Sequence, residues 1–314
     1  EGAYIIVSHD RTFLNSTVNK IVEVYASKLN LYSGNYDYYL EEKKLRNEVQ
    51  QNAFENQQQK IKEAERFIER FKAKATKAKQ AQSKVKQLEK LDRIEAVVDE
   101  NMQVNFKFNF KTQSGRHVKR LQDISKSYGD LDILEKATLG LQRGDKVALI
   151  GANGKGKSTV LRIIAGTEAH EGQVETGHNV LMSFYAQHQL EALNINNDLV
   201  EELKQEGTGK NEQELRGVLG CFLFSGDEVF KKIKVLSGGE KSRVALAKAL
   251  ISEANFLLLD EPTNHLDMLS VGILVQALQQ YEGTFLVVSH DRHFITKVAN
   301  KIWWIEDHQL KEYP

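Results

Sequence analysis

The sequence of 314 residues contains a single cysteine, two prolines and no long apolar run. One cysteine excludes a disulfide within the chain, and the place of Cys221 in the apolar stretch LGCFLF favours a core position over a nucleophilic role. No apolar run approaches the roughly 18 residues of a membrane span, and the first residues lack the basic and apolar pattern of a signal peptide. These absences predict a cytoplasmic protein with no membrane partner.

The sequence also lacks an overall charge, because 43 basic residues balance 43 acidic ones. A zero balance gives no general attraction to nucleic acid, so such a contact would need a local cluster. One cluster exists, since no acidic residue occurs between Arg70 and Lys86. Its lysines, which we treat as candidate RNA contacts, are Lys72, Lys74, Lys77, Lys79, Lys84 and Lys86. A basic run is also typical of an ordinary solvated helix face, and charge alone leaves both interpretations open.

Glycine and proline are absent between Gly34 and Gly115, and residues 41–97 have the pattern of helix. Their apolar side chains recur at spacings of three and four, which places them on one stripe that needs a partner helix. A single rod of this length would be about 85 Å long, so we expect two antiparallel helices that turn near residues 72–79. The strict alternation of residues 102–111 then predicts a half-buried strand that opens a new domain.

A glycine-rich loop follows the apolar strand KVALIG. Its pattern, Gly151-x-x-x-x-Gly156-Lys157-Ser158, is that of a phosphate-binding loop between a strand and a helix. The glycines let backbone N–H groups surround a phosphate, Lys157 reaches the β and γ phosphates, and Ser158 can ligate Mg²⁺. The residues predicted to bind ATP in this loop are Gly151, Asn153, Gly154, Gly156, Lys157, Ser158 and Thr159.

The apolar run NFLLLDEP, residues 255–262, ends in two carboxylates. A buried strand of this kind delivers Asp260 and Glu261 to the carboxyl edge of the sheet, where ligands bind in open α/β sheets. Asp260 is then placed to hold Mg²⁺, and Glu261 to polarise the water that attacks in phosphoryl transfer. The alternative is an acid pair at a helix start before Pro262. The phosphate-binding loop in the same chain favours the catalytic interpretation.

The stretch LSGGEKSRVALAKAL places Ser237, Gly238 and Gly239 directly before an amphipathic helix, where free N–H groups and a hydroxyl can meet a phosphate. LSGGE between a phosphate-binding loop and LLLDEP, followed by VSHD, resembles an ATP-binding-cassette (ABC) domain. The resemblance covers residues 98–314. It implies an α/β fold, a P-loop nucleotide-binding domain with an antiparallel β subdomain and a helical subdomain.

This resemblance also implies roles for single residues. Gln187 corresponds to the Q-loop glutamine, with a part in Mg²⁺ binding and catalysis; His290 corresponds to the switch histidine, and Tyr128 to the aromatic that stacks on adenine. The signature, which completes an ATP site on another cassette, corresponds to Ser237, Gly238, Gly239 and Glu240. Each of three residues also has an alternative interpretation without a function. Gln187 can be a polar residue at the edge of the sheet, His290 a hydrogen-bonded histidine at a helix start, and Tyr128 an aromatic residue packed in the core.

The segments DEPTNHLD and LSGGEKSRVALAKAL, together with a basic helical-hairpin arm, resemble the ABC-F family of tandem-cassette proteins. This resemblance implies an ATPase that uses ATP and Mg²⁺ and acts on the ribosome in translation, with the arm directed to transfer RNA and the peptidyl-transferase centre. The nucleotide-binding subunit of an ABC transporter shares the motifs but does not ordinarily carry such an arm. A chromosome-maintenance ATPase has its coil between the Walker motifs, whereas this chain has globular sequence there. An ATP-gated scaffold with little turnover stays open.

The pentapeptide VSHDR occurs twice, at residues 7–11 and 288–292. We interpret residues 1–40 as the end of a first cassette, residues 41–97 as the basic arm and residues 98–314 as a complete second cassette. An ATP sandwiched between two cassettes needs a second signature. We therefore expect weak hydrolysis by this chain, with the missing part supplied by its own first cassette in a longer protein, or by a homodimer or strand swap.

Overall fold

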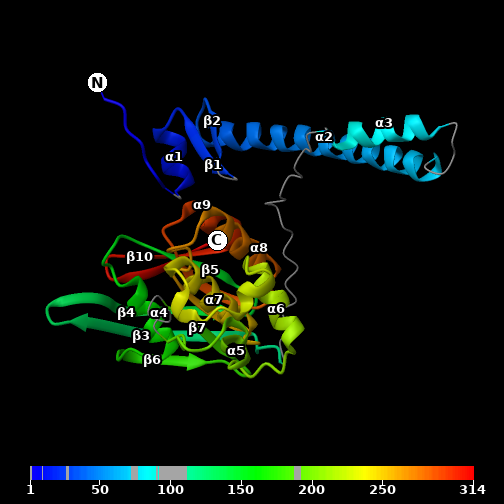
Figure 1. Cartoon of the computed structure of the whole chain (residues 1–314). Helices are drawn as coiled ribbons and strands as arrows, with labels where there is room; N and C mark the ends of the chain where they lie inside the picture. Colours follow the sequence, from blue (N-terminus) through cyan, green and yellow to red (C-terminus); the bar gives the residue numbers. More distant parts are fainter. Residues whose placement is uncertain are drawn as a thin grey trace. The chain divides into compact units, whose positions relative to one another are not determined.

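The computed structural model describes residues 2–8, 10–25, 28–71, 77–89, 91, 112–186 and 192–314. The chain divides into two compact units, residues 1–101 and 102–314 (Figure 1). The strand expected at residues 102–111 lies outside the described residues. Among the helices that are described, none is long and apolar enough to cross a membrane.

The described residues of the first unit form a short helix, a hairpin and two longer helices (Figure 1). Their bounds are α1 Arg11–Thr17, β1 Ile21–Tyr25, β2 Lys28–Tyr32, α2 Tyr36–Phe71 and α3 Ala78–Glu89. Helix α2 begins five residues before the expected start at residue 41, because the Asn35 carboxamide accepts a hydrogen bond from the Tyr38 N–H at 3.1 Å and caps it. Helix α2 ends at Phe71 and α3 begins at Ala78, so the predicted turn falls mostly on residues outside the described ones.

The two arm helices pack against each other through the distal part of α2. Ile61 and Ala64 of α2 are buried, and the Lys84 ammonium of α3 lies 5.6 Å from the centre of the Phe67 ring. The predicted helical pairing is therefore present.

The side chain of Glu23, on β1 of the hairpin, contacts the first turns of α2. Its carboxylate accepts hydrogen bonds from the hydroxyls of Tyr39 at 2.8 Å and Tyr32 at 3.1 Å, and forms an ion pair with Lys43 at 2.6 Å. Burial by itself would raise the pKa of Glu23, but the hydrogen bonds from Lys43 and Tyr39 outweigh it and hold that pKa below its usual range. Helix α2 is thereby fixed to β1 at its first turns.

Within its described residues, the second unit has a mainly parallel sheet of six strands and an antiparallel sheet of three. The order in the larger sheet is β11-β10-β5-β9-β8-β7, with bounds β5 Lys146–Ile150, β7 Met182–Tyr185, β8 Phe256–Asp260, β9 Thr284–Val288, β10 Lys301–Glu306 and β11 Gln309–Tyr313. The smaller sheet has the order β4-β3-β6, with bounds β3 His117–Tyr128, β4 Leu131–Gln142 and β6 Glu171–Thr176. The antiparallel subdomain expected from the sequence is present.

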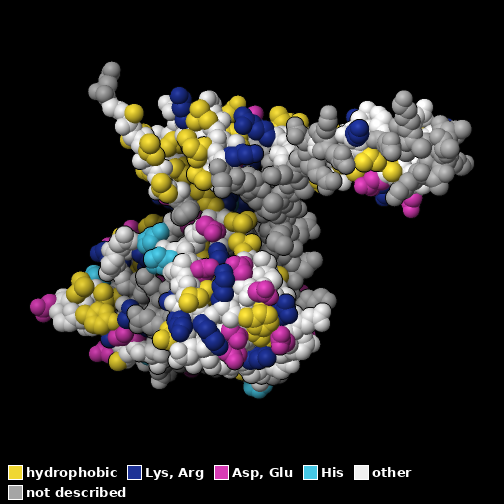
Figure 2. Space-filling view, viewed as in Figure 1, with side chains coloured by type: hydrophobic (Ala, Val, Ile, Leu, Met, Phe, Trp, Pro, Cys, Tyr) yellow, Lys and Arg dark blue, Asp and Glu magenta, His cyan; other side chains and the backbone are white. Residues whose placement is uncertain are grey.

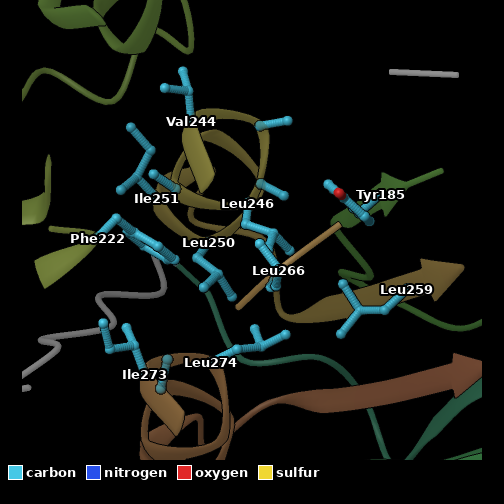
Figure 3. Packing of buried hydrophobic residues seen from close by; sticks show 14 of the residues in the cluster. Tyr185, Phe222, Val244, Leu246, Leu250, Ile251, Leu259, Leu266, Ile273 and Leu274 are labelled. Atoms are coloured by element: carbon cyan, nitrogen blue, oxygen red, sulfur yellow. The ribbon is translucent and has the colours of Figure 1, made fainter. Parts of the chain in front are cut away.

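Helices cover both faces of the six-stranded sheet. The α-helices of this unit are α4 Lys157–Ala165, α5 Leu199–Lys204, α6 Glu212–Cys221, α7 Gly238–Ile251, α8 Met268–Gln280 and α9 Arg292–Val298. Helix α4 shares one core with the antiparallel sheet, and α7, α8 and α9 share the core on the other face. In that second core, Leu246 and Leu250 of α7 point toward Leu266, and Leu274 of α8 approaches from the other side (Figure 3).

The repeated pentapeptide marks a repeated local structure. Asp10 and Asp291 each accept a hydrogen bond from the N–H three residues later, at 2.9 Å in both copies, and so cap α1 and α9. The hairpins that follow have matching registers, with Ile21 opposite Tyr32 in the first copy and Ile302 opposite Tyr313 in the second. The internal duplication inferred from the sequence is thus also a structural one.

The two copies differ in burial. Trp303 and Ile305 of β10 are 0% and 3% exposed, because β10 pairs with β5 and faces its core. Their counterparts in β1, Val22 and Val24, are 58% and 75% exposed. Hydrophobic side chains accordingly gather over α1 and the hairpin of the first unit (Figure 2). The first copy displays a face that the second copy buries.

A buried ion pair joins α5 to α7, and its loss is expected to destabilise the second unit. The Glu202 side chain is 0% exposed and accepts hydrogen bonds from Lys248 at 2.7 Å and Asn197 at 2.9 Å. Glu202→Ala leaves Lys248 without this partner, so we expect chemical denaturation to show a loss of about 3 kcal/mol in unfolding free energy. Glu212→Ala, which removes an exposed pair at 3.9 Å, is the control and should lose about 0.5 kcal/mol or less. Equal losses would contradict this interpretation.

Candidate functional site

A tight loop joins β5 to α4 at the carboxyl edge of the parallel sheet. Gly154 and Gly156 adopt φ angles of +77° and +91°, which side chains other than glycine rarely tolerate. A Cβ atom at Gly156 would also collide with Ile133 of β4. Gly156 is the residue before α4, whose first backbone N–H groups have no partner within the helix. The predicted phosphate-binding loop is therefore present at a helix amino terminus, where it can hold an anion.

The ammonium of Lys157 is held at this loop. It donates hydrogen bonds to the backbone oxygens of Gly151 at 3.0 Å and Ala152 at 3.1 Å, and its side chain is largely buried. Thr159 is buried in the first turn of α4, and Asn153 is exposed on the loop. The positive charge thus lies beside the N–H groups that would surround a phosphate.

Ser158 and Asp260 meet, although they are far apart in the sequence. The Ser158 hydroxyl donates a hydrogen bond of 3.1 Å to the Asp260 carboxylate, which ends β8. Oxygen atoms of this kind suit Mg²⁺, which usually takes one or two protein ligands and completes its shell with phosphate oxygens and water. The described residues contain no group of three acidic, histidine or cysteine side chains that would hold a metal unaided. The donor set fits a Mg²⁺ ion that arrives with a nucleotide.

Glu261 has an unusual backbone conformation and a specific partner. Its φ angle is +50°, in the left-handed region, and its N–H donates to the Val288 oxygen at 2.9 Å. Its carboxylate lies 3.2 Å from His290 Nε2 and accepts a 3.3 Å hydrogen bond from the His290 N–H. Burial raises the pKa of Glu261, and the neighbouring Asp260 acts in the same direction while His290 opposes it. The structure therefore brings Glu261 and His290, two of the three side chains predicted to be catalytic, together beside Asp260.

Two hydroxyls that the sequence analysis missed connect these loops. Thr263 and Ser289 lie 3.0 Å apart, and Ser289 also accepts a hydrogen bond of 3.1 Å from the Asp291 N–H. Each stands within two residues of a predicted catalytic side chain. The contact fixes the segment after Glu261 against the turn that carries His290.

The signature residues form the start of α7. Ser237 caps the helix by accepting a hydrogen bond from the Glu240 N–H at 3.3 Å, and its own N–H and hydroxyl both donate to the Glu240 carboxylate at 2.8 Å. This is a complete capping box. A Cβ at Gly239 would lie 2.9 Å from the His265 oxygen, so the first turn of α7 lies against residues 265–267, which we call the D-loop segment.

Tyr128 lies at the end of β3, close to the phosphate-binding loop. It pairs with Leu131 of β4, the strand whose Ile133 touches Gly156, and its ring is exposed rather than packed in the core. The Lys126 ammonium lies 4.5 Å from the centre of the ring, and it also forms an ion pair of 2.7 Å with Glu168. One side of the ring is thus engaged by Lys126, a residue that sequence reasoning did not single out.

The remaining predicted residues are only partly described. Gln187, Lys72 and Lys74 lie outside the described residues, and so does the side chain of Lys79. Lys77, Lys84 and Lys86 are exposed on the arm.

Comparison with known proteins shows the family and the fold. Two family models, both described as ABC transporter, match residues 22–106 and 134–264. A dimeric post-hydrolysis structure of the ATP-binding cassette MJ0796 with ADP and Pi has a TM-score of 0.52 and 25% identity, and the match covers 62% of this chain and 98% of that one.

The curated relatives identify the type of cassette. The putative ATP-binding protein YdiF of Bacillus subtilis is 43% identical over 99% of this chain and 49% of its own length. The probable ATP-binding protein YheS of Escherichia coli K12 is 37% identical over 100% of this chain and 49% of its own, and ABC transporter F family member 5 of Arabidopsis thaliana is 37% identical over 98% and 45%. The chain is an ABC-F protein. It spans about half the length of the curated relatives it matches.

Both parts of this ABC-F protein correspond to recognised domains. The model over residues 134–264 includes the phosphate-binding loop, the signature and the Asp260–Glu261 pair. The model over residues 22–106 covers the hairpin except its first residue, Ile21, and the described arm helices. The expected fold, an ABC cassette preceded by a helical arm, is confirmed.

Proposed function

We propose that this ABC-F protein binds ATP with Mg²⁺ and hydrolyses it to ADP and phosphate. One observation carries the proposal: a glycine loop at a helix start, the Ser158–Asp260 pair and the Glu261–His290 pair all lie at the carboxyl edge of one sheet. The relatives named ATP-binding proteins support the same assignment.

In this mechanism the N–H groups around residues 153–159 and Lys157 bind the β and γ phosphates. Mg²⁺, held by Ser158 and Asp260 with Gln187 assigned to it by resemblance, would neutralise charge on the phosphate oxygens. Glu261 orients the attacking water and accepts its proton, a role for which a raised pKa is favourable. His290 keeps the Glu261 carboxylate in place. The exposed ring of Tyr128 stacks on the adenine.

We also propose that the signature, Ser237 to Glu240, completes an ATP site whose phosphate-binding loop belongs to another cassette. The dimeric state of the related cassette supports this arrangement. In a longer protein the partner is the protein's own first cassette. The exposed side chains of Val22 and Val24 suit that cassette. Their counterparts in β10 are buried in a core shared with β5, the neighbouring strand that leads into the phosphate-binding loop. In this chain alone, the partner is a second copy.

The cellular target that we propose is the ribosome, in the cytoplasm, with the arm contacting ribosomal and transfer RNA. The exposed Lys77, Lys84 and Lys86 support this, because lysines that neutralise phosphates supply most of the sequence-independent affinity for RNA. The contacts of Glu23 with Tyr39 and Lys43 also support this target, since they fix the start of α2 to the hairpin and so help to place the arm tip at a defined position.

Co-sedimentation with ribosomes tests this target. We expect the Glu261→Gln chain to pellet with ribosomes several-fold more with ATP than without it, and Lys77, Lys84 and Lys86 changed together to Gln to reduce pelleting at least several-fold, more so at low salt. Changing the exposed cassette lysines Lys204, Lys297 and Lys311 to Gln is the control with the same loss of charge. If neither ATP nor the arm lysines alter pelleting, the ribosomal proposal is wrong.

A further inference from the structure

One arginine joins the signature helix to the D-loop segment. Arg243 lies on α7, and its Nη1 is 3.6 Å from Asp267 Oδ2 and 3.5 Å from the Ser270 hydroxyl at the start of α8. The guanidinium lies 5.1 Å from the centre of the Phe224 ring. The arginine side chain is 15% exposed, so these contacts act in a mostly water-excluded place.

Asp267 holds two elements with its two oxygens. Oδ1 accepts a hydrogen bond of 2.7 Å from the Ser270 N–H and so caps α8, whereas Oδ2 faces Arg243. The first turn of α7 meets the same segment again, where Gly239 approaches the His265 oxygen. The signature helix and the D-loop segment are therefore in contact at two points. One is the backbone approach of Gly239 to the His265 oxygen, and the other is the ion pair of Arg243 with Asp267.

The two residues before the D-loop segment contact the backbone of Glu261 and the turn that carries His290. The Asn264 N–H donates to the backbone carbonyl oxygen of Glu261 at 3.1 Å, and the Thr263 hydroxyl lies 3.0 Å from the Ser289 hydroxyl, beside His290. A displacement of Glu261 or of the His290 turn would thus be transmitted through residues 263–267 to Arg243. That chain of contacts ends at the signature helix.

The contacts of Arg243 are weaker than those of a well-formed ion pair. Its contacts of 3.5 and 3.6 Å are longer than a good charge-assisted hydrogen bond, and its buried Nε has no hydrogen-bond partner within the described residues. An unpaired buried donor is unfavourable, so a movement that lets the guanidinium engage Asp267 more closely would be stabilised. The stacking face of Phe224 keeps the guanidinium oriented while such a movement takes place.

We propose that Arg243 is a positioning residue that couples the ATP site of one cassette to the signature it presents to another. Arg243 does not touch nucleotide in this role. It sets the position of Ser237 to Gly239 according to the position of Asp267. The inference rests on the proposed function, because it requires that the signature serve a second cassette.

The test compares Arg243→Met, Arg243→Lys and Asp267→Asn with Lys204→Met, a control on the exposed surface of the same unit. Asparagine is as good a helix cap as aspartate, so Asp267→Asn removes the charge but keeps the start of α8. We expect ATP affinity to stay within about twofold while turnover falls about tenfold in Arg243→Met and Asp267→Asn and less in Arg243→Lys. The double variant, with Arg243→Met and Asp267→Asn together, should lose no more turnover than the more impaired of the two single variants, because both substitutions remove the same contact.

Amide hydrogen exchange of the nucleotide-free full chain gives a readout that needs no turnover. Exchange at residues 264–270 should rise in Arg243→Met and Asp267→Asn and stay unchanged in Lys204→Met, with unchanged circular dichroism. The inference would be overturned if the Arg243 variants had the same turnover and the same amide exchange as the wild type. It would also be overturned if the losses of turnover in the double variant were additive. A wild-type chain that fails to bind ATP would instead overturn the proposed function, while the exchange experiment would still decide whether Arg243 holds the segment.

Discussion

Glu261→Gln is expected to lower the rate of ATP hydrolysis about a hundredfold or more and to leave ATP binding nearly unchanged. A positioned general base contributes roughly 10²- to 10⁴-fold to a reaction of this kind, and glutamine cannot accept the proton. Glutamine has nearly the same shape and can still accept the hydrogen bond that the His290 N–H donates to position 261. The change therefore removes proton acceptance with little disturbance of the loop.

Phosphate release and equilibrium ATP binding, measured on the same preparations, separate these two effects. Glu282→Gln, an exposed carboxylate before β9, is the matched control and should retain wild-type turnover. The Glu261→Gln chain should also accumulate as an ATP-dependent dimer in sizing chromatography, because the ATP that holds two cassettes together is no longer hydrolysed. Turnover of the Gln variant within about threefold of the wild type would show that another group acts as the base.

The parts of the site that could be predicted from the sequence are those whose chemistry imposes a local pattern. Gly154 and Gly156 are required by their positive φ angles, and Ser158 follows at the helix start, so a short motif specifies the whole loop. Asp260 and Glu261 end an apolar run, which fixes the sheet edge at which they lie. The repeated pentapeptide likewise indicated that the chain contains the end of a second copy of the cassette, and in both copies its aspartate caps the following helix.

The contacts between loops could not be predicted, because they depend on segments that are distant in sequence. Nothing near Arg243 indicates that its guanidinium reaches Asp267, and nothing near Thr263 indicates Ser289. The early start of α2 is different, since the cap Asn35 was visible in the sequence and could have placed it correctly. The exposure of Val22 and Val24 needed the structure, because their pattern alone reads as a half-buried strand.

Lys157→Ala is expected to abolish ATP turnover by removing the charge that binds the phosphates, and Ser237→Asp is expected to abolish it for a different reason. Aspartate still caps α7, but it places a negative charge where the signature would face the phosphate of another cassette. In a composite site these two losses affect different chains. A Lys157→Ala chain can still present a signature, and a Ser237→Asp chain can still bind ATP.

Mixing the two variants therefore tests the central claim, that each ATP site is built from two cassettes. Random pairing of equal amounts makes half of the dimers mixed, each with one intact site, so the mixture should recover about a quarter of wild-type turnover. Ser237→Asn, which caps without a charge, should retain more turnover alone than Ser237→Asp does. The measurement is phosphate release by each variant and by the mixture as total protein concentration rises. Recovered turnover that increases more than linearly with concentration is the predicted result, and a mixture as inactive as its two components, beside an active wild type, would contradict the account.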